Sequence, residues 1–180
     1  MRLVATEYVS LDGIFDEPGE WSFPYFNEEA SQFKADELAA TEALLLGRRT
    51  YQGFAAAWPT MEGTGDFGVR MNSMPKYVVT STLDKLDWSG SKQVKGDIPG
   101  EIRKLKQQPG KDLLLSGSGM LFNALMGENL IDLYRLMVHP IVIGRGNHLF
   151  GDTTDHRKLR LVETRRFATG IVILELEPAA

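Results

Sequence analysis

The sequence predicts an α/β fold, in which helices flank a mostly parallel sheet that ends in an antiparallel hairpin. Apolar or β-branched segments alternate with segments of helical periodicity over most of the chain. Two of the apolar segments stop at short glycine-containing turns directly before a helix. Two further strand-like segments, residues 159–166 and 170–176, follow each other closely and pair naturally as a terminal hairpin.

Length and composition narrow the class of protein. The 180 residues predict a single domain, residues 1–180, with room for a sizeable core. The net charge is −4, from 20 basic and 24 acidic residues, so nothing points to a nucleic-acid partner. The absence of cysteine excludes disulfides, thiolate metal sites and cysteine nucleophiles. The three histidines are not spaced as metal ligands, so we expect no metal site.

The hydropathy pattern gives no sign of a membrane or secretory segment. No apolar segment approaches the ~18 residues that span a bilayer. Residues 1–7 become polar too early for the apolar stretch of a signal peptide. We therefore expect no membrane partner, and a cytoplasmic enzyme or binding protein.

The first elements are set by residue type and by capping. Residues 2–9 mix β-branched and apolar side chains and predict a strand, which the turn sequence of residues 10–13 ends. A loop rich in glycine, proline and acidic residues follows. Asn27 can cap the next helix, because its side chain can accept a hydrogen bond from the first turn. Phe26 and Ala30 begin the helical spacing there.

The middle of the chain predicts two strands around a short helix and a loop. Residues 44–47 predict a buried strand, and residues 51–58 a short helix that Pro59 ends. Residues 61–74 contain three glycines with little periodicity and predict a loop. Residues 76–81 predict another strand.

The second half of the chain continues the alternation of predicted strands and helices. Prolines begin and stop a helix over residues 98–108. The remaining elements are a strand over 112–116, a helix over 120–126, a long central strand over 131–143 that contains Pro140, and a turn over 144–147.

The two strand-to-helix junctions carry the chemistry. In the first, Leu46 and Gly47 are followed at once by Arg48, Arg49 and Thr50. The start of a helix presents unpaired N–H groups and positive dipole, and guanidinium groups grip phosphates in bidentate fashion.

The second junction repeats this arrangement without the charge. Gly117, Ser118, Gly119 and Met120 follow the strand over 112–116. Two such junctions in one small α/β chain predict a ligand with more than one phosphate, and a dinucleotide fits best. The acidic residue that an NAD site of Rossmann type needs about 20 residues beyond the glycine turn is absent.

At this point the chain resembles the dihydrofolate reductase-like superfamily, and within it the C-terminal reductase domain of bacterial riboflavin biosynthesis enzymes. Five motifs in order carry the resemblance over nearly the whole chain: Ser10–Gly13, Gly47–Tyr51, Val78–Thr82, Gly117–Gly119, and Leu130–Leu133 with Pro140–Gly146. The resemblance implies a three-layer dihydrofolate reductase-like fold with about eight strands. It also implies NADPH as hydride donor, a small-molecule substrate and a homodimer.

The residues support NADPH for a reason of their own. The 2′-phosphate of NADPH needs positive charge and hydroxyl donors near the adenosine ribose. Arg48 or Arg49 supplies the charge, and Ser81 and Thr82 supply the hydroxyl groups. These four residues, with Gly47, Thr50 and residues 117–120, form the predicted cofactor site.

The resemblance further implies a substrate site between the loop after the first strand and the helix after Asn27. It assigns Asp12 and Glu29 to catalysis, because one of them or water must donate a proton to the product. The substrate would contact Asp12, Gly13, Trp21, Glu29 and Phe33. Asp12, Trp21 and Glu29 have a structural interpretation as well, since Asp-Gly pairs form turns, Trp21 can anchor its loop by packing, and acids favour a first helical turn.

The predicted function is an NADPH-dependent reductase of a pyrimidine- or pteridine-like substrate. The closest reaction within the resemblance is that of 5-amino-6-(5-phosphoribosylamino)uracil reductase. Two alternatives stay open. A dihydrofolate reductase proper would depend on Glu29, whereas a non-catalytic nucleotide-binding module would bind the cofactor without turnover.

Overall fold

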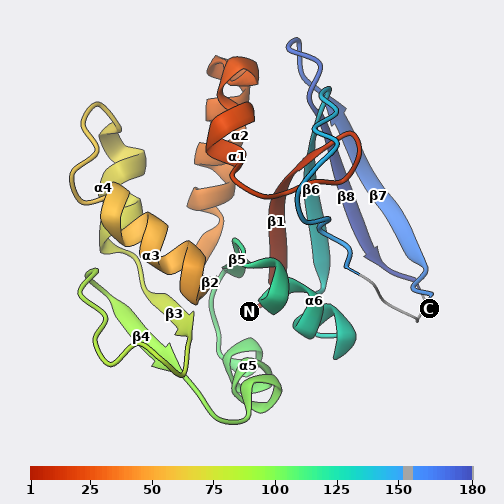
Figure 1. The fold of residues 1–180 in the computed structure, drawn as a ribbon. Coiled ribbons are helices and arrows are strands. Elements are labelled where there is room, and N and C mark those ends of the chain that lie inside the picture. The colour runs from red at the N-terminus through yellow and green to blue at the C-terminus, as the bar shows by residue number, and fades with distance from the viewer. Residues whose placement is uncertain (152–155, 180) are drawn as a thin grey trace.

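An eight-stranded mixed sheet forms the centre of the computed structural model, which describes residues 1–151 and 156–179 (Figure 1). The strand order across the sheet is β4-β3-β2-β5-β1-β6-β8-β7. The strands are β1 (Leu3–Ser10), β2 (Thr41–Gly47), β3 (Lys76–Val79), β4 (Ser91–Val94), β5 (Asp112–Leu115), β6 (Leu133–His139), β7 (Leu159–Arg166) and β8 (Val172–Pro178).

The direction of the strands confirms the predicted fold class. All pairings from β4 across to β6 are parallel. Only β8 runs antiparallel to its neighbours, between β6 and β7, so β7 and β8 form the predicted C-terminal hairpin. Because the six strands β1 to β6 are parallel, their carboxyl ends lie along one edge of the sheet, where ligands of open α/β sheets bind.

Helices cover both faces of the parallel part of the sheet and make the three layers (Figure 1). The α-helices are α1 (Pro18–Trp21), α2 (Glu28–Ala39), α3 (Arg48–Ala57), α4 (Gly65–Ser73), α5 (Ile98–Gln107) and α6 (Gly119–Gly127), and one 3₁₀ turn, η1 (Phe23–Tyr25), follows α1. Helices α5 and α6 pack on one face of the sheet, and α2, α3 and α4 pack on the other.

The alternation of side chains along β5 shows how the two cores are separated. Leu113 and Leu115 pack in the core under α5 and α6, whereas Leu114 packs in the core under α2, α3 and α4. All three side chains are buried, which explains the continuous apolar sequence of this strand. Helices cover both faces of the sheet at β5, so these three consecutive side chains all face a core.

The helix α4 and the strand β4 are differences from the sequence-based prediction. The loop expected over residues 61–74 contains α4, because Met71 is buried in the core and Gly68 packs closely against Thr64. Burial of one helix face outweighs the low helix propensity of glycine. No strand was expected at Ser91–Val94, which is a short edge strand with mostly polar, exposed residues.

The central strand expected over residues 131–143 is shorter in the structure. It begins at Leu133 and ends at His139, because Pro140 cannot donate a hydrogen bond to the neighbouring strand. Residues 141–144 pack instead against the loop after β1, where the N–H of Leu11 donates to the carbonyl of Ile141 at 2.8 Å. Within the described part of the chain, no helix is long and apolar enough to cross a membrane.

A buried lysine holds the start of β3. Lys76 has no exposed surface, and its Nζ donates to the carbonyls of Met74 at 2.8 Å, Ser89 at 2.9 Å and Asn72 at 3.2 Å. The ammonium also lies 4.2 Å from the centre of the Trp88 ring. The side chain therefore ties together α4, β3 and the segment before β4.

We expect Lys76→Met to lower the free energy of unfolding by about 2–4 kcal/mol, because the change leaves three inward-facing carbonyls without a donor. Urea denaturation measures the effect. The matched control is Lys92→Met on β4, where the side chain is exposed. An equal loss in both variants would contradict a structural role for Lys76.

Candidate cofactor and substrate site

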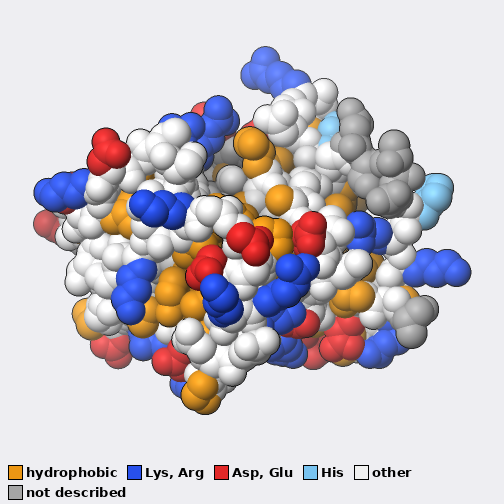
Figure 2. All heavy atoms as spheres, turned by 90° about the horizontal axis from the view of Figure 1, so that it is seen from below, with side chains coloured by type: hydrophobic (Ala, Val, Ile, Leu, Met, Phe, Trp, Pro, Cys, Tyr) orange, Lys and Arg blue, Asp and Glu red, His pale blue; other side chains and the backbone are white. Residues whose placement is uncertain are grey.

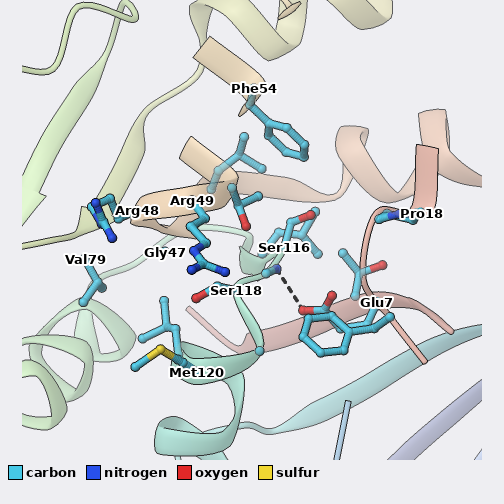
Figure 3. A pocket seen from close by; sticks show the side chains of 18 of the residues that line it. Glu7, Pro18, Gly47, Arg48, Arg49, Phe54, Val79, Ser116, Ser118 and Met120 are labelled. Atoms are coloured by element: carbon cyan, nitrogen blue, oxygen red, sulfur yellow. Dashed lines mark hydrogen bonds between the residues drawn. The ribbon is translucent and has the colours of Figure 1, made fainter. Parts of the chain in front are cut away.

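A cavity of about 1850 Å³ opens at the carboxyl edge of the parallel strands. Its walls come from the ends of β1, β2, β3, β4 and β5, from the first turns of α3 and α6, from α2, and from the loop after β1. Figure 3 shows a close view of its lining, with side chains of both strand-to-helix junctions directed toward one space.

The first junction places two arginines at the start of a ten-residue helix. Strand β2 ends at Gly47 and α3 begins at Arg48, three residues earlier than the sequence predicted. Arg48 and Arg49 are exposed and both line the cavity. In Figure 3, Arg48 lies on the side of Val79 and Arg49 on the side of Ser118. Two separate points of the cavity therefore receive positive charge, next to the free N–H groups of the helix.

The second junction lies directly against the first. The N–H of Gly47 donates to the carbonyl of Gly117 at 3.1 Å. A Cβ atom at Gly47 would lie 2.5 Å from Oγ of Ser118, and one at Gly117 would lie 2.5 Å from Oγ1 of Thr50. Gly117 also has a positive φ of 64°, which favours glycine. Both glycines leave space that lets the two backbones form one cradle.

Hydroxyl groups after β3 and a lysine after β4 complete this end of the cavity. Ser81 and Thr82 are exposed and line it, and the turn is held because Oγ1 of Thr80 accepts from the N–H of Thr82 at 3.2 Å. Lys95, which the sequence analysis did not identify, lines the same region directly after β4. Its strand was missed, so nothing in the sequence placed it beside β3.

The residues predicted to bind the cofactor thus come together in space. All of them line this one cavity: Gly47, Arg48, Arg49, Thr50, Ser81, Thr82, Gly117, Ser118, Gly119 and Met120. The cradle at Gly47 and Gly117, the cationic groups and the hydroxyl groups fit the phosphates of a dinucleotide. Their role in binding stays a prediction.

The residues predicted to contact substrate are not brought together. Asp12 and Gly13 do not line the cavity. The carboxylate of Asp12 accepts hydrogen bonds from the Ser10 hydroxyl at 2.6 Å and from the N–H of Gly144 at 2.8 Å. These bonds lower the pKa of Asp12 to about 2, so the group is ionised near neutrality. The geometry supports the turn-forming interpretation of Asp12.

The other predicted substrate contacts have structural partners. Oε2 of Glu29 accepts from the N–H of Ala168 at 2.9 Å, on the exposed surface outside the cavity. Phe33 packs edge-on against Phe167 with ring centres 5.6 Å apart. Trp21 lines a second, smaller cavity and donates from Nε1 to the carbonyl of Asp16 at 2.8 Å. Their roles toward substrate stay predictions without support from the cavity.

A buried glutamate at the cavity was missed by the sequence analysis. Glu7 on β1 is 8% exposed and lines the cavity, and its Oε1 accepts from the N–H of Gly117 at 2.8 Å (Figure 3). Burial raises the pKa of Glu7 to about 8, although the Gly117 N–H and the charge of Lys34 act in the opposite direction. A single glutamate inside a strand-like segment has no local signal that separates it from a surface residue.

Helix α2 adds a network of charges to the same cavity. Lys34 and Glu37 both line it and form an ion pair. Nζ of Lys34 also donates to Oγ1 of Thr6 at 3.2 Å, and Arg135 on β6 contacts Oε1 of Glu37 at 3.0 Å and Oε1 of Glu175 at 2.6 Å. The burial of Glu37 is compensated by two cations, whereas Glu7 forms no ion pair among the described residues.

Aromatic side chains line much of the remaining wall. Tyr8 and Phe26 lie with ring centres 5.8 Å apart, and Trp58 lies 5.4 Å from Phe67. All four line the cavity. Flat aromatic walls favour flat, partly apolar ligands such as heterocyclic rings.

Figure 2 shows a face on which basic and acidic side chains are interspersed, with no continuous basic patch. Among residues 1–151 and 156–179, no group of three histidine, aspartate or glutamate side chains is arranged to hold a metal ion.

Comparison with known proteins shows the family and the fold of this chain. The model of the RibD C-terminal domain matches residues 2–173. The uncharacterized protein YyaP of Bacillus subtilis is 29% identical over 175 residues, which cover 95% of this chain and 92% of YyaP. A protein assigned to riboflavin biosynthesis from Shewanella sp. PV-4 superposes with a TM-score of 0.78 at 19% identity, over 100% of both chains.

Dihydrofolate reductase from Enterococcus faecalis, solved with NADP(H), superposes with a TM-score of 0.60 at 14% identity, over 98% of this chain and 95% of that enzyme. These structures show that the fold is dihydrofolate reductase-like. The chain belongs to the RibD C-terminal domain family, a family of reductases, as the resemblance predicted.

Proposed function

We propose that the protein is an NADPH-dependent reductase of a pyrimidine- or pteridine-like compound, of the 5-amino-6-(5-phosphoribosylamino)uracil reductase type. The observation that carries the proposal is the convergence of both strand-to-helix junctions on one cavity. NADPH supplies a hydride when it is bound. The residues of the chain bind the cofactor, orient the substrate and supply a proton.

The cationic groups of the cavity favour NADPH over NADH. Arg48, Lys95, Ser81 and Thr82 line the region after β3 and β4, where positive charge and hydroxyl groups would hold a 2′-phosphate. Arg49 and the turn over residues 117–119 would hold the bridging phosphates. The aromatic lining fits a flat heterocyclic substrate.

Thermal unfolding with NADPH and NADH in parallel tests the cofactor. At 100 times its dissociation constant, NADPH is expected to add ~2.7 kcal/mol. For a chain of this size that raises the midpoint by roughly 5–10 °C. NADH at the same concentration should shift the midpoint much less. Equal shifts with both nucleotides would contradict 2′-phosphate recognition, and no shift with either would contradict the cofactor site.

The rate of NADPH consumption with each of two candidate substrates distinguishes the candidate functions. Consumption of NADPH is measured with 5-amino-6-(5-phosphoribosylamino)uracil and, separately, with dihydrofolate. Faster turnover of the ribosylaminouracil supports the proposal, whereas turnover of dihydrofolate alone indicates a dihydrofolate reductase. Cofactor binding without turnover of either compound indicates the non-catalytic module. The homodimer implied by the resemblance stays a prediction.

A further inference from the structure

We propose that Glu7 is the proton donor of the reductase reaction, in place of Asp12 or Glu29. The inference rests on the proposed function and names the residue that completes its chemistry. Hydride transfer to a C=N or C=O carbon leaves an electron pair on nitrogen or oxygen, and this atom must receive a proton. A donor must therefore carry a proton and lie at the cavity.

The position of Glu7 meets the requirement of access. It lies in the second half of β1, a central strand between β5 and β6. The residue is 8% exposed and lines the cavity. Oε1 is fixed by the N–H of Gly117, which belongs to the turn of the predicted cofactor site. Among the described residues, Oε2 forms no hydrogen bond and is free to donate a proton to a ligand.

The surroundings keep this carboxyl group protonated near neutrality. The charged groups that act on Glu7 are Lys34 and Glu37 of α2, and they already form an ion pair with each other. The turn after β5 contributes a single N–H. Burial therefore dominates, and the pKa of about 8 leaves most of the population protonated at pH 7.

None of the three other carboxylic acids Asp12, Glu29 and Glu37 combines these properties. Asp12 is held ionised by three hydrogen bonds and lies outside the cavity. Glu29 is exposed outside the cavity and accepts from the backbone of Ala168. Glu37 lines the cavity but is paired with Lys34 and Arg135, which lower its pKa against the effect of burial.

The proposed step balances with NADPH as the reductant. The double bond of the substrate gains a hydride at carbon and is reduced, while NADPH is oxidised to NADP⁺. The O–H bond of Glu7 breaks, and an N–H or O–H bond forms at the neighbouring substrate atom. Water then returns a proton to the Glu7 carboxylate, so that one proton is taken from solvent in each turnover.

Glu7→Gln tests the step, because the amide keeps the shape of the side chain and its bond from Gly117 but cannot act as the acid. We expect turnover of 5-amino-6-(5-phosphoribosylamino)uracil to fall at least 100-fold. The midpoint shift with NADPH should stay unchanged. Glu7→Asp keeps a carboxyl group and should recover part of the activity, and Glu62→Gln, an exposed change of the same type, serves as the control.

A second readout does not depend on turnover. The ¹³C resonance of the Glu7 carboxyl group, assigned by its absence in Glu7→Gln, should titrate near pH 8 in the unliganded protein. In the wild type, kcat should fall tenfold for each pH unit above that value, and this fall should be absent in Glu7→Gln.

The possible outcomes distinguish a failure of the proton-donor role of Glu7 from a failure of the proposed reductase function. If the wild type turns over the substrate and Glu7→Gln does so within a few-fold, the donor role is overturned and the reductase stands. Titration of Glu7 near pH 4.5, or a loss of NADPH affinity with unchanged turnover, overturns it as well. If the wild type binds NADPH but reduces neither test compound, the proposed function fails and the role of Glu7 fails with it.

Discussion

Replacement of both Arg48 and Arg49 by alanine is expected to weaken NADPH binding at least about 100-fold while the fold is retained. Each guanidinium lies at the start of α3, lines the cavity, and is exposed in the unliganded protein. Charge-assisted hydrogen bonds of this kind contribute about 1.5–3 kcal/mol each. The loss of both therefore removes about 3 kcal/mol or more of binding free energy.

Calorimetric titration with NADPH, with NADH, and at two salt concentrations measures this effect. The affinity of the wild type for NADPH should fall with salt, and that of the double variant should respond less. The matched control is Arg103→Ala with Arg160→Ala, which removes two exposed arginines outside the cavity. An NADPH affinity unchanged in the double variant would contradict the assignment of the first junction to phosphate binding.

Glu7→Gln is also expected to make the protein more stable at high pH. The pKa of Glu7 is raised from its ordinary value of 4.5 to about 8 by burial, so the folded state holds a proton more tightly than the unfolded chain. This contribution is fully present below pH 4.5 and is lost as pH rises through 8. Each pH unit between these values removes about 1.4 kcal/mol of stability from the wild type.

The variant lacks this dependence because an amide does not titrate. The two proteins should have similar stability near pH 4.5, and the variant should be more stable by roughly 4–5 kcal/mol at pH 9. Urea denaturation at a series of pH values, at constant ionic strength, measures the difference in free energy of unfolding between the two proteins. The contributions of the other titrating groups are the same in both proteins and cancel in this difference. Two curves that run parallel from pH 5 to 9 would show that Glu7 is ionised in the folded protein.

Much of the fold was predictable because its signals are local. The apolar segments at β1, β2 and β5 and the cap at Asn27 are each read from a few neighbouring residues. The hairpin of β7 and β8 is likewise set by two adjacent segments and the turn between them. Helix α4 and strand β4 were not predicted, because their residues have low propensity. Burial of Met71 and the bond from Arg70 to the Thr41 carbonyl hold α4, and pairing with β3 holds β4.

The predicted cofactor residues and the surroundings of Glu7 also differ in how local their sequence signals are. The predicted cofactor residues directly follow strand ends, and parallel strands bring those ends to one edge of a sheet, so the sequence placed them together, although it did not place Lys95 beside them. The surroundings of Glu7 are non-local. The groups that act on it are the N–H of Gly117, which is 110 residues away, and the charges of Lys34 and Glu37 on α2.

The sequence alone therefore determined the α/β class, the strand-to-helix junctions and the family. Only the tertiary structure decided which carboxyl groups are buried at the cavity. It places Glu7 and the ion-paired Glu37 there, while Asp12 and Glu29 accept from backbone N–H groups elsewhere. The physical reason is that the protonation of a carboxyl group depends on the solvent and charges within a few ångströms, and these come from every element that packs around it.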